Sequence, residues 1–185
     1  LVLKFYNLRR QQILSAMPNR AHMAIAELEK DFNIQVITQN IDDLHERAGS
    51  SKIIHLHGEI LKVRSSINPN LITEHREELV LGEKAEDGSQ LRPHIVWFGE
   101  SVPEMDQAIK VMTKAEIVIV VGTSLNVYPA AGLIQYAPTN AEFFIVDPAE
   151  VNHSSLRKVK FLRTSATIGI PQIADLLRKE MKIVS

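Results

Sequence analysis

Cysteine is absent from all 185 residues of the chain, which excludes disulfides and every cysteine-ligated zinc site. The absence fits a reducing compartment, so we expect a cytoplasmic protein. Strong charge of either sign is also missing. The formal net charge of -1 gives no electrostatic reason to bind nucleic acid or an anionic membrane. No apolar run approaches the roughly 20 residues that a membrane-spanning helix needs. Composition thus indicates a globular protein that binds neither nucleic acid nor membranes, and it leaves the oligomeric state open.

Strand patterns and helix patterns alternate along the chain. Residues 117–121 are wholly apolar and β-branched, which is typical of a strand buried on both faces of a parallel sheet. Gly49 suits the left-handed C-terminal cap of a short helix. Apolar spacing predicts helices at 2–13, 21–32, 41–48, 103–115, 129–136 and 170–181, and strands at 35–38, 53–57, 94–98, 117–121 and 143–146. The fold class is therefore α/β with a mostly parallel sheet.

Residues 65–90 interrupt this alternation. They are polar, lack strong periodicity and contain turn signals such as Asp87-Gly88. A long irregular stretch inside a compact domain is usually functional or mobile. We therefore predict one α/β domain made of residues 1–64 and 91–185, with residues 65–90 inserted as a small subdomain.

Polar side chains follow the strand that is predicted to end at Thr38. Gln39, Asn40 and Asp42 lie in the predicted connection between this strand and the following helix. Open α/β sheets bind ligands at such carboxyl ends, and amide and carboxylate groups there can bind ribose hydroxyls and a carboxamide. The alternative is that Asn40 or Asp42 only caps the following helix. The residues alone leave both interpretations open.

Two histidines, His55 and His57, end the next predicted strand. Residues two apart on a strand point the same way, so both imidazoles could hold one metal ion in a metallohydrolase, with His45 or Glu59 as a further ligand. A second hypothesis makes one histidine a general base near pH 7. A third gives both histidines no chemical role. Their spacing does not decide among the three.

A glycine and two hydroxyl residues, Gly122, Thr123 and Ser124, follow the buried strand 117–121. The glycine allows a ligand to approach the backbone, and the hydroxyls and amides can take phosphate oxygens. The same three residues also make an ordinary turn. The chain contains neither G-x-G-x-x-G nor G-x-x-x-x-G-K-[ST].

Aromatic and cationic side chains form two weaker signals. The segment V-W-F-G-E at 96–100 holds the only Trp, which either walls an apolar slot or belongs to the core. On the first helix, Tyr6 and Arg9 are three residues apart and point from one face. Together they suit a carboxylate, and separately they suit a core tyrosine and a solvated arginine.

The order of four motifs is more specific than any of them alone. These are T-Q-N-I-D-x-L-H-x-x-A-G at 38–49, H-x-H-G-E at 55–59, V-W-F-G-E at 96–100 and G-T-S-x-x-V-x-P at 122–129. Together they resemble the sirtuin family of NAD-dependent protein deacylases over nearly the whole chain. The opening F-Y-N-L-R-R is similar to the bacterial and mitochondrial subgroup that removes succinyl and malonyl groups. The resemblance implies a Rossmann-like sheet with helices on both faces, NAD as cofactor and acylated-lysine proteins as substrates.

The resemblance also implies roles for individual residues. The general base would be His57, with Asn40 and Asp42 against the nicotinamide as further catalytic residues. The cofactor site would comprise Gln39, Asn40, Asp42, Gly122, Thr123, Ser124, Asp147 and Ala166. The substrate site would comprise Tyr6 and Arg9 at the acyl carboxylate, and Val96, Trp97, Phe98, Gly99, Glu100 and Val127 along the peptide and the acyl-lysine tunnel. The products would be free lysine, nicotinamide and an O-acyl-ADP-ribose.

The chain departs from the family pattern in three places. The G-A-G-x-S phosphate loop and its central strand would lie before Leu1, so we expect either one piece of a longer protein or a chain that is inactive alone. The four zinc-binding cysteines are missing, and Ser65 and Ser66 lie near the first expected pair. We predict no metal, no structural zinc and a small subdomain that is reduced or loosely ordered. Asp147 stands where an asparagine often contacts ribose, although a carboxylate also accepts hydroxyl bonds.

Two further alternatives stay open. One is a catalytically inactive module that binds NAD or ADP-ribose. The missing phosphate loop favours it and the presence of His57 opposes it. The other is ADP-ribosyl transfer to protein, which is possible on the same fold.

Overall fold

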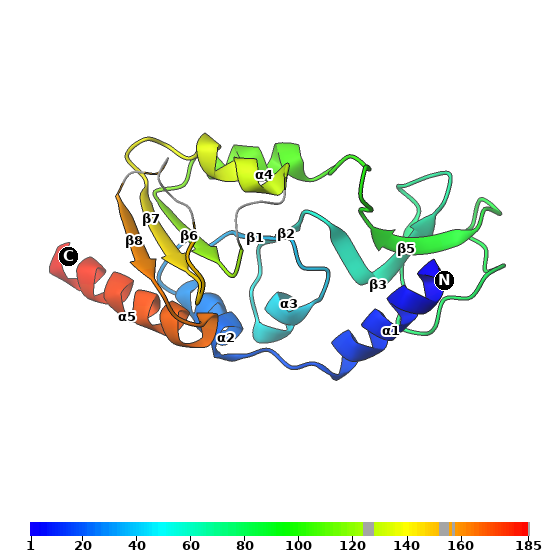
Figure 1. Ribbon diagram of the computed structural model, residues 1–185, viewed down its shortest axis with the longest axis horizontal. Coiled ribbons are helices and arrows are strands. Elements are labelled where there is room, and N and C mark those ends of the chain that lie inside the picture. Colours follow the sequence, from blue (N-terminus) through cyan, green and yellow to red (C-terminus); the bar gives the residue numbers. More distant parts are fainter. Residues whose placement is uncertain (124–127, 152–155, 157, 185) are drawn as a thin grey trace.

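Helices and strands alternate in the computed structural model, which describes residues 1–123, 128–151, 156 and 158–184 (Figure 1). The helices are α1 Val2–Ser15, α2 Arg20–Leu28, α3 Leu44–Ala48, α4 Met105–Met112, the 3-10 helix η1 Ala130–Tyr136 and α5 Ala166–Val184. The strands are β1 Val36–Thr38, β2 Ile53–His55, β3 Gly58–Ser65, β4 Ile72–Glu74, β5 Leu91–Ile95, β6 Ile117–Val121, β7 Glu142–Val146 and β8 Val159–Leu162. The described strands form three sheets, in the orders β1-β2, β4-β3-β5 and β6-β7-β8.

The parallel sheet β6-β7-β8 has helices on both faces (Figure 1). Phe144 and Val146 of β7 pack on one side against Ile173 of α5 and the start of α2. Phe143 and Ile145 alternate to the other side, where they join a cluster with side chains of α4 and η1. Strands buried on both faces read as continuous apolar runs, so this region confirms the predicted α/β fold class.

Helix α5 lies so close to β7 that only glycine fits at the contact. A Cβ atom at Gly169 would lie 2.5 Å from Cγ1 of Val146. The helix begins at Ala166, whereas apolar spacing predicted a start at residue 170. Pro171 lies inside α5.

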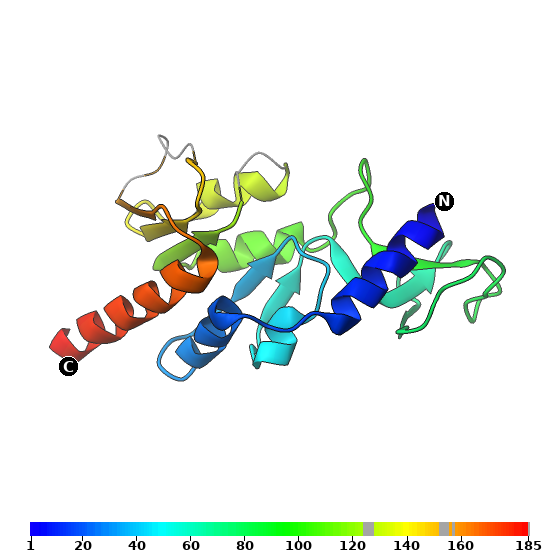
Figure 2. The same cartoon turned by 60° about the horizontal axis from the view of Figure 1, so that its bottom comes forward.

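Strands β1 and β2 form a separate two-stranded parallel sheet (Figure 2). Their register pairs Thr38 with His55, so the two strands end side by side. Beneath them Ile54 and Leu56 are buried in a cluster with Ala108 of α4. This pairing brings residues that are distant in sequence to one carboxyl edge.

The antiparallel sheet β4-β3-β5 lies at the other end of the molecule and is covered by α1. Its apolar cluster contains Ile60, Leu61 and Ile95, with Tyr6 of α1 and Trp97 packed against them. The segment 65–90 connects β3 to β5 and contributes the edge strand β4, which pairs antiparallel with β3.

A glycine begins β3 because the partner strand passes very close. Gly58 has φ +81, and a Cβ atom there would lie 2.1 Å from the carbonyl oxygen of His94. An L-residue would therefore meet both a disfavoured backbone conformation and a direct clash. The close approach fixes the chain immediately after His57.

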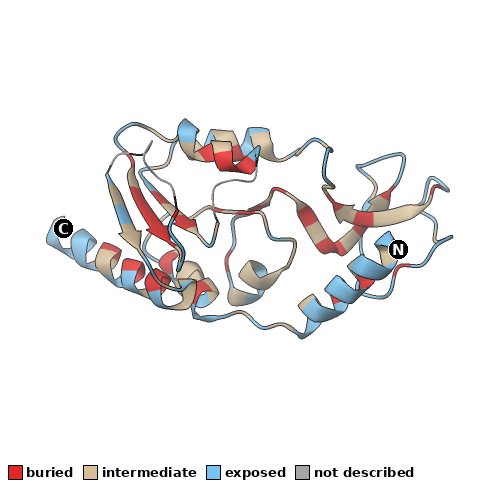
Figure 3. Cartoon of the chain, in the orientation of Figure 1, coloured by how far each residue is buried: buried red, intermediate tan, exposed pale blue. Residues whose placement is uncertain are grey.

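Figure 3 shows that most of α1 is exposed. Its buried residues, Asn7 and Arg10, are polar. The Asn7 side chain donates to the Leu79 carbonyl at 2.9 Å and accepts from the Leu79 amide at 3.1 Å. Arg10 donates to the Ile60 carbonyl at 3.0 Å and to Asn7 at 2.8 Å. Polar contacts as well as apolar ones therefore hold α1 on the antiparallel sheet.

Several boundaries differ from the sequence predictions. The predicted strand 94–98 is β5, which ends at Ile95, and the predicted helix 41–48 begins only at Leu44. Strands β3, β4 and β8 were not predicted. Each is short or mixed in polarity, so its own sequence pattern is weak. Each forms because it pairs with a neighbouring strand. Among the described residues, no helix has the length and apolar character needed to cross a membrane.

Candidate active site

His57 lies just beyond the end of β2, beside the residues that follow β1. Its Nδ1 atom lies 3.1 Å from the Gln39 carbonyl oxygen. A carbonyl oxygen only accepts hydrogen bonds, so Nδ1 carries the hydrogen and the lone pair of the neutral ring is on Nε2. The imidazole is thus oriented as a base.

The polar residues after β1 hold their own backbone in place. The Asn40 amide donates to Thr38 Oγ1 at 3.0 Å, and Asp42 Oδ1 accepts from the Leu44 amide at 3.1 Å. Asp42 therefore orders the turn that leads into α3, although the N-cap residue of that helix is Asp43 and makes no side-chain cap hydrogen bond. At the other end of α3, Gly49 has φ 104, which confirms the predicted left-handed cap.

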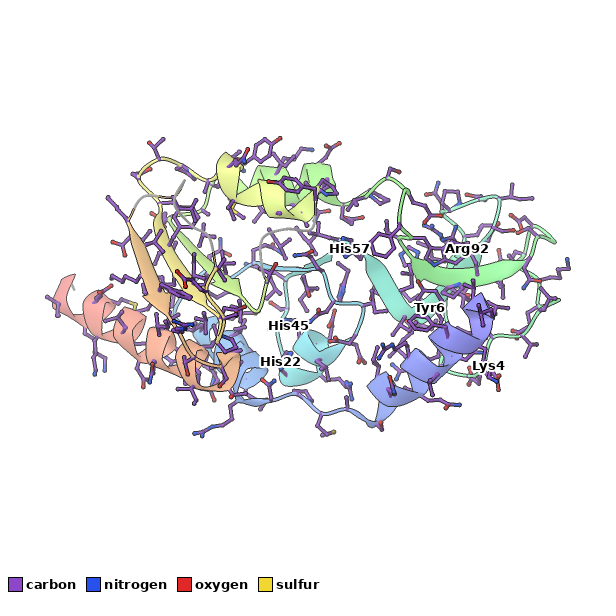
Figure 4. All side chains as sticks on the ribbon, in the orientation of Figure 1. Lys4, Tyr6, His22, His45, His57 and Arg92 are labelled. Carbon is purple, nitrogen blue, oxygen red and sulfur yellow. The ribbon has the colours of Figure 1, made fainter. Side chains whose placement is uncertain are left out.

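A pair of partly buried histidines, His22 and His45, lies next to this segment (Figure 4). Their ring centroids are 4.8 Å apart in an edge-to-face arrangement. Burial lowers the pKa of both rings, and the nearby charge of Asp42 opposes that shift only in part. Both rings are therefore neutral near pH 7. Sequence reasoning missed this pair because the two histidines lie on different helices, and local spacing does not relate them.

The hypothesis that His55 and His57 share one metal ion, one of three left open by their spacing, does not agree with the structure. Strand β2 ends at His55, so the rule that residues two apart share a strand face does not reach His57. His55 Nε2 lies 2.6 Å from Glu46 Oε1, while His57 turns to Gln39. Burial lowers the pKa of His55, but the hydrogen bond and charge of Glu46 outweigh it and leave that pKa above its ordinary value.

The segment V-W-F-G-E follows β5 and is joined directly to His57. The Val96 amide donates to the His57 carbonyl at 3.0 Å. Trp97 is partly buried and stacks with Tyr6 at a centroid distance of 6.3 Å. Phe98 is fully exposed. The segment therefore lies next to the base, with one of its aromatic rings inward and one outward.

A cluster of charged side chains fixes this segment. Arg92 makes two hydrogen bonds with the Glu100 carboxylate, at 2.7 and 3.1 Å, and its guanidinium lies 3.6 Å from the centroid of the Trp97 ring. Glu100 also accepts from the Trp97 amide at 2.9 Å, and Arg64 lies 3.5 Å away. The hydrogen bonds from Arg92 lower the pKa of Glu100. Sequence reasoning missed Arg64 and Arg92, which become partners through the β3–β5 register.

Tyr6 and Arg9 on α1 have different surroundings. Tyr6 is partly buried against Trp97, and burial raises the pKa of its hydroxyl. Arg9 is exposed and donates to Gln12 at 3.1 Å. Tyr6 therefore contacts the V-W-F-G-E segment, whereas the Arg9 guanidinium lies at the exposed surface of α1, 5.3 Å from the centroid of the Phe5 ring.

The remaining predicted cofactor residues follow β6 and β7, apart from Ala166, which follows β8. Gly122 has φ +59 and donates to the Val146 carbonyl at 3.1 Å, with Thr123 next to it. Asp147 Oδ1 accepts from the Ala149 amide at 2.7 Å, and Ala166 begins α5. Ser124 and Val127 lie outside the described residues. The described members lie at carboxyl ends of parallel strands, where open sheets bind ligands.

Comparisons with known proteins agree with this geometry. A model described as the Sir2 family matches residues 2–129. The chain is 53% identical over 183 residues to an NAD-dependent protein deacylase of Bacteroides thetaiotaomicron, which covers 96% of this chain and 78% of that protein. It is 48% identical over 184 residues to an NAD-dependent protein deacylase of Helicobacter pylori, covering 100% and 79%.

Two solved structures share the arrangement of the chain. One is a complex of a Sir2 homologue with NAD, with a TM-score of 0.87 and 36% identity over 97% of this chain and 72% of that chain. The other is Sir2 bound to an acetylated peptide, with a TM-score of 0.76 and 31% identity over 98% and 79%.

Proposed function

The chain belongs to the Sir2 family, and from this premise we propose that it is an NAD-dependent protein lysine deacylase that prefers succinyl- or malonyl-lysine. The main observation in support of this reaction is the contact between His57 Nδ1 and the Gln39 carbonyl oxygen at 3.1 Å. It holds the imidazole beside the polar residues that follow β1, with Nε2 left to act as the base. A base of this kind works best when its pKa lies near the operating pH.

The residues at the strand ends suit a dinucleotide. Asn40 and Asp42 can bind a carboxamide, Gln39 a ribose hydroxyl, and Gly122 and Asp147 the phosphate and adenosine side. Bound NAD would supply an electrophilic ribose carbon with nicotinamide as leaving group. Of the relatives, one was solved with NAD and one with an acetylated peptide, which supports acylated-lysine proteins as substrates.

The proposed acyl preference depends on Tyr6 and Arg9. Tyr6 stacks on Trp97, within the segment that we propose lines the acyl-lysine tunnel. Arg9 follows three residues later on the same helix, and its hydrogen bond to Gln12 is exposed. Exchanging this bond for one with an acyl carboxylate costs little, and guanidinium–carboxylate bonds are strong. We also propose a cytoplasmic location, because a chain without cysteine fits a reducing compartment.

The Arg9→Met variant tests this preference. It should reduce kcat/KM for a succinyl-lysine peptide by about 10- to 100-fold, the value of a hydrogen bond to a charged group, and leave an acetyl-lysine peptide nearly unchanged. Lys4→Met, an exposed change on the same helix, is the matched control and should affect neither peptide. Equal losses for both peptides would rule out the carboxylate contact.

A further inference from the structure

Three potential metal ligands meet on the side of the molecule next to α3. Glu46 comes from α3, His55 ends β2 and Glu59 lies near the start of β3. One ligand atom from each lies within 4.8 Å of the others. Among the residues that the structure describes, no other three histidine or carboxylate side chains bring their ligand atoms within this distance. Three separate elements thus place a histidine and two carboxylates around one point.

The histidine of this group is held firmly. Its side chain is only 9% exposed, and its Nε2 atom faces Glu46 Oε1 at 2.6 Å. The pairing of His55 with Thr38 in the β1–β2 sheet fixes the backbone below it. A ligand that is already buried and oriented loses little entropy when it binds an ion.

A cavity of about 320 Å³ lies beside the group. Its lining contains five carboxylates and two cationic side chains, in the residues Asp42, Asp43, Glu46, Glu59, Glu74, Lys62 and Arg76. This excess of negative charge favours a cation. Two of these carboxylates already have a cationic partner, since Lys62 Nζ lies 2.8 Å from Glu59 Oε2 and Arg47 Nε lies 2.9 Å from Asp43 Oδ1.

The missing cysteines led to the expectation of no metal, but that expectation considered only the structural zinc site of the family. We propose that Glu46, His55 and Glu59 bind one divalent transition-metal ion of the Zn²⁺ or Mn²⁺ type. Imidazole and carboxylate ligands suit such ions, and water from the cavity would complete the coordination. The ion takes the place of the proton shared by His55 and Glu46. Glu59 can keep its ion pair with Lys62 through one carboxylate oxygen and bind the metal ion through the other. This site differs from the proposed catalytic base, because His57 is not a ligand, and it does not depend on the deacylase assignment.

Metal titration of the chelator-treated, dialysed protein tests the proposal. Calorimetry with Zn²⁺ and electron paramagnetic resonance with Mn²⁺ should each show one ion per chain. Glu46→Gln and Glu59→Gln keep the side-chain size and should each weaken binding about tenfold or more, since even outer-shell changes often cost 10- to 100-fold. Glu74→Gln, which removes a charge from the same cavity outside the three ligands, should leave the affinity within about threefold.

Three results would overturn the site. They are no binding of either ion at micromolar concentration, unchanged affinity in both ligand variants, and equal weakening by Glu74→Gln, which would indicate a diffuse acidic surface. His22→Gln serves as a further control, because His22 and His45 also lie close together. Loss of binding in that variant alone would assign the ion to the histidine pair instead. Thermal melting of each variant establishes that it is folded.

Discussion

The parallel sheet β6-β7-β8 and the antiparallel sheet β4-β3-β5 are held together by different kinds of contact. In β7 the consecutive residues Phe144, Ile145 and Val146 are at most 1% exposed and pack against helices on both faces. In the antiparallel region, buried serines share the interior with the apolar cluster. Apolar burial is enough to stabilise the parallel sheet, because helices cover both of its faces. In the antiparallel region, directional hydrogen bonds are also needed to hold the long segment 65–90 against its sheet.

Ser65 is the centre of these polar bonds. Its hydroxyl lies 2.6 Å from Asp87 Oδ2 and 2.7 Å from Ser89 Oγ, and it accepts from the amides of Ile67 and Asn68 at 3.0 and 2.9 Å. The residue lies near the place where the family pattern has its first cysteine pair. A hydrogen-bonded cluster therefore joins the two ends of the segment 65–90. Buried polar groups are tolerated when they are bonded in this way.

Removing the central apolar side chain of the parallel sheet should have the largest effect. Phe144→Ala should lower the free energy of unfolding by about 3–5 kcal/mol, because Phe144 is fully buried and the change leaves a cavity. Denaturant unfolding measures this loss. Phe98→Ala removes the same side chain from a fully exposed position and should change stability by less than about 0.5 kcal/mol. Similar losses in both variants would contradict the packing described for β7.

Removing the polar contact of α1 should have the next largest effect. Asn7→Ala leaves the Leu79 amide and carbonyl and one Arg10 nitrogen without their partner, so it should cost about 2–4 kcal/mol. Hydrogen exchange should increase first around Leu79 and hardly at all in β7. The exposed change Gln11→Ala on the same helix is the control. Uniform acceleration across the molecule would show that α1 does not stabilise the antiparallel region separately.

Ser65→Ala should have a smaller and more local effect. It removes the hydroxyl that joins four partners and should cost about 1–3 kcal/mol. The amides of Ile67 and Asn68 should lose protection from exchange. Ser66→Ala changes an exposed neighbour and should leave both amides protected. If the two variants behave alike, the hydrogen-bonded cluster does not hold the segment.

The smallest expected effect is on the pH dependence of stability. Burial lowers the pKa of His22 and His45 below the ordinary value of 6.5, so below that pH the unfolded chain binds protons that the folded chain does not. Their contribution therefore makes stability fall as pH falls. His55, whose pKa is raised, acts in the opposite sense, because its stabilisation is present at low pH and lost as pH rises.

Comparing wild type with His45→Gln isolates the first contribution. The free energy of unfolding of the variant should fall less steeply than that of wild type between about pH 6.5 and pH 5. Series of denaturant titrations at each pH give the two slopes. Parallel slopes would mean that burial of these rings has no measurable consequence.

The sequence was sufficient for the fold class because Ile117–Val121 is apolar at every position and helical patterns lie on both sides of it. Gly49 was predicted correctly because a left-handed cap has few alternatives to glycine. The proximity of Gln39 and His57 follows from parallel pairing of two strands, which sequence order suggested. The placement of polar residues at the two strand ends could therefore be predicted, whereas their roles in the site stay predictions.

Long-range partners could not be read from the sequence in the same way. The contact of Arg92 with Glu100 depends on a strand register, and the contact of His55 with Glu46 depends on where β2 ends. The Ser65 cluster joins residues that are separated by a polar segment without periodicity. Local patterns carry no information on such pairs, which form when the packed backbone brings them together.

The most direct test of NAD-dependent deacylation at His57 is a stoichiometric assay with a succinyl-lysine peptide. Nicotinamide and deacylated peptide are measured together, with and without NAD, in wild type and His57→Gln. We expect one nicotinamide for each acyl group removed, no turnover without NAD, and a loss of at least about 100-fold in the variant, since general bases contribute 10²–10⁴-fold. NAD binding without deacylation, nicotinamide release with ADP-ribose transferred to the peptide, or an unchanged rate in His57→Gln would contradict the proposed function.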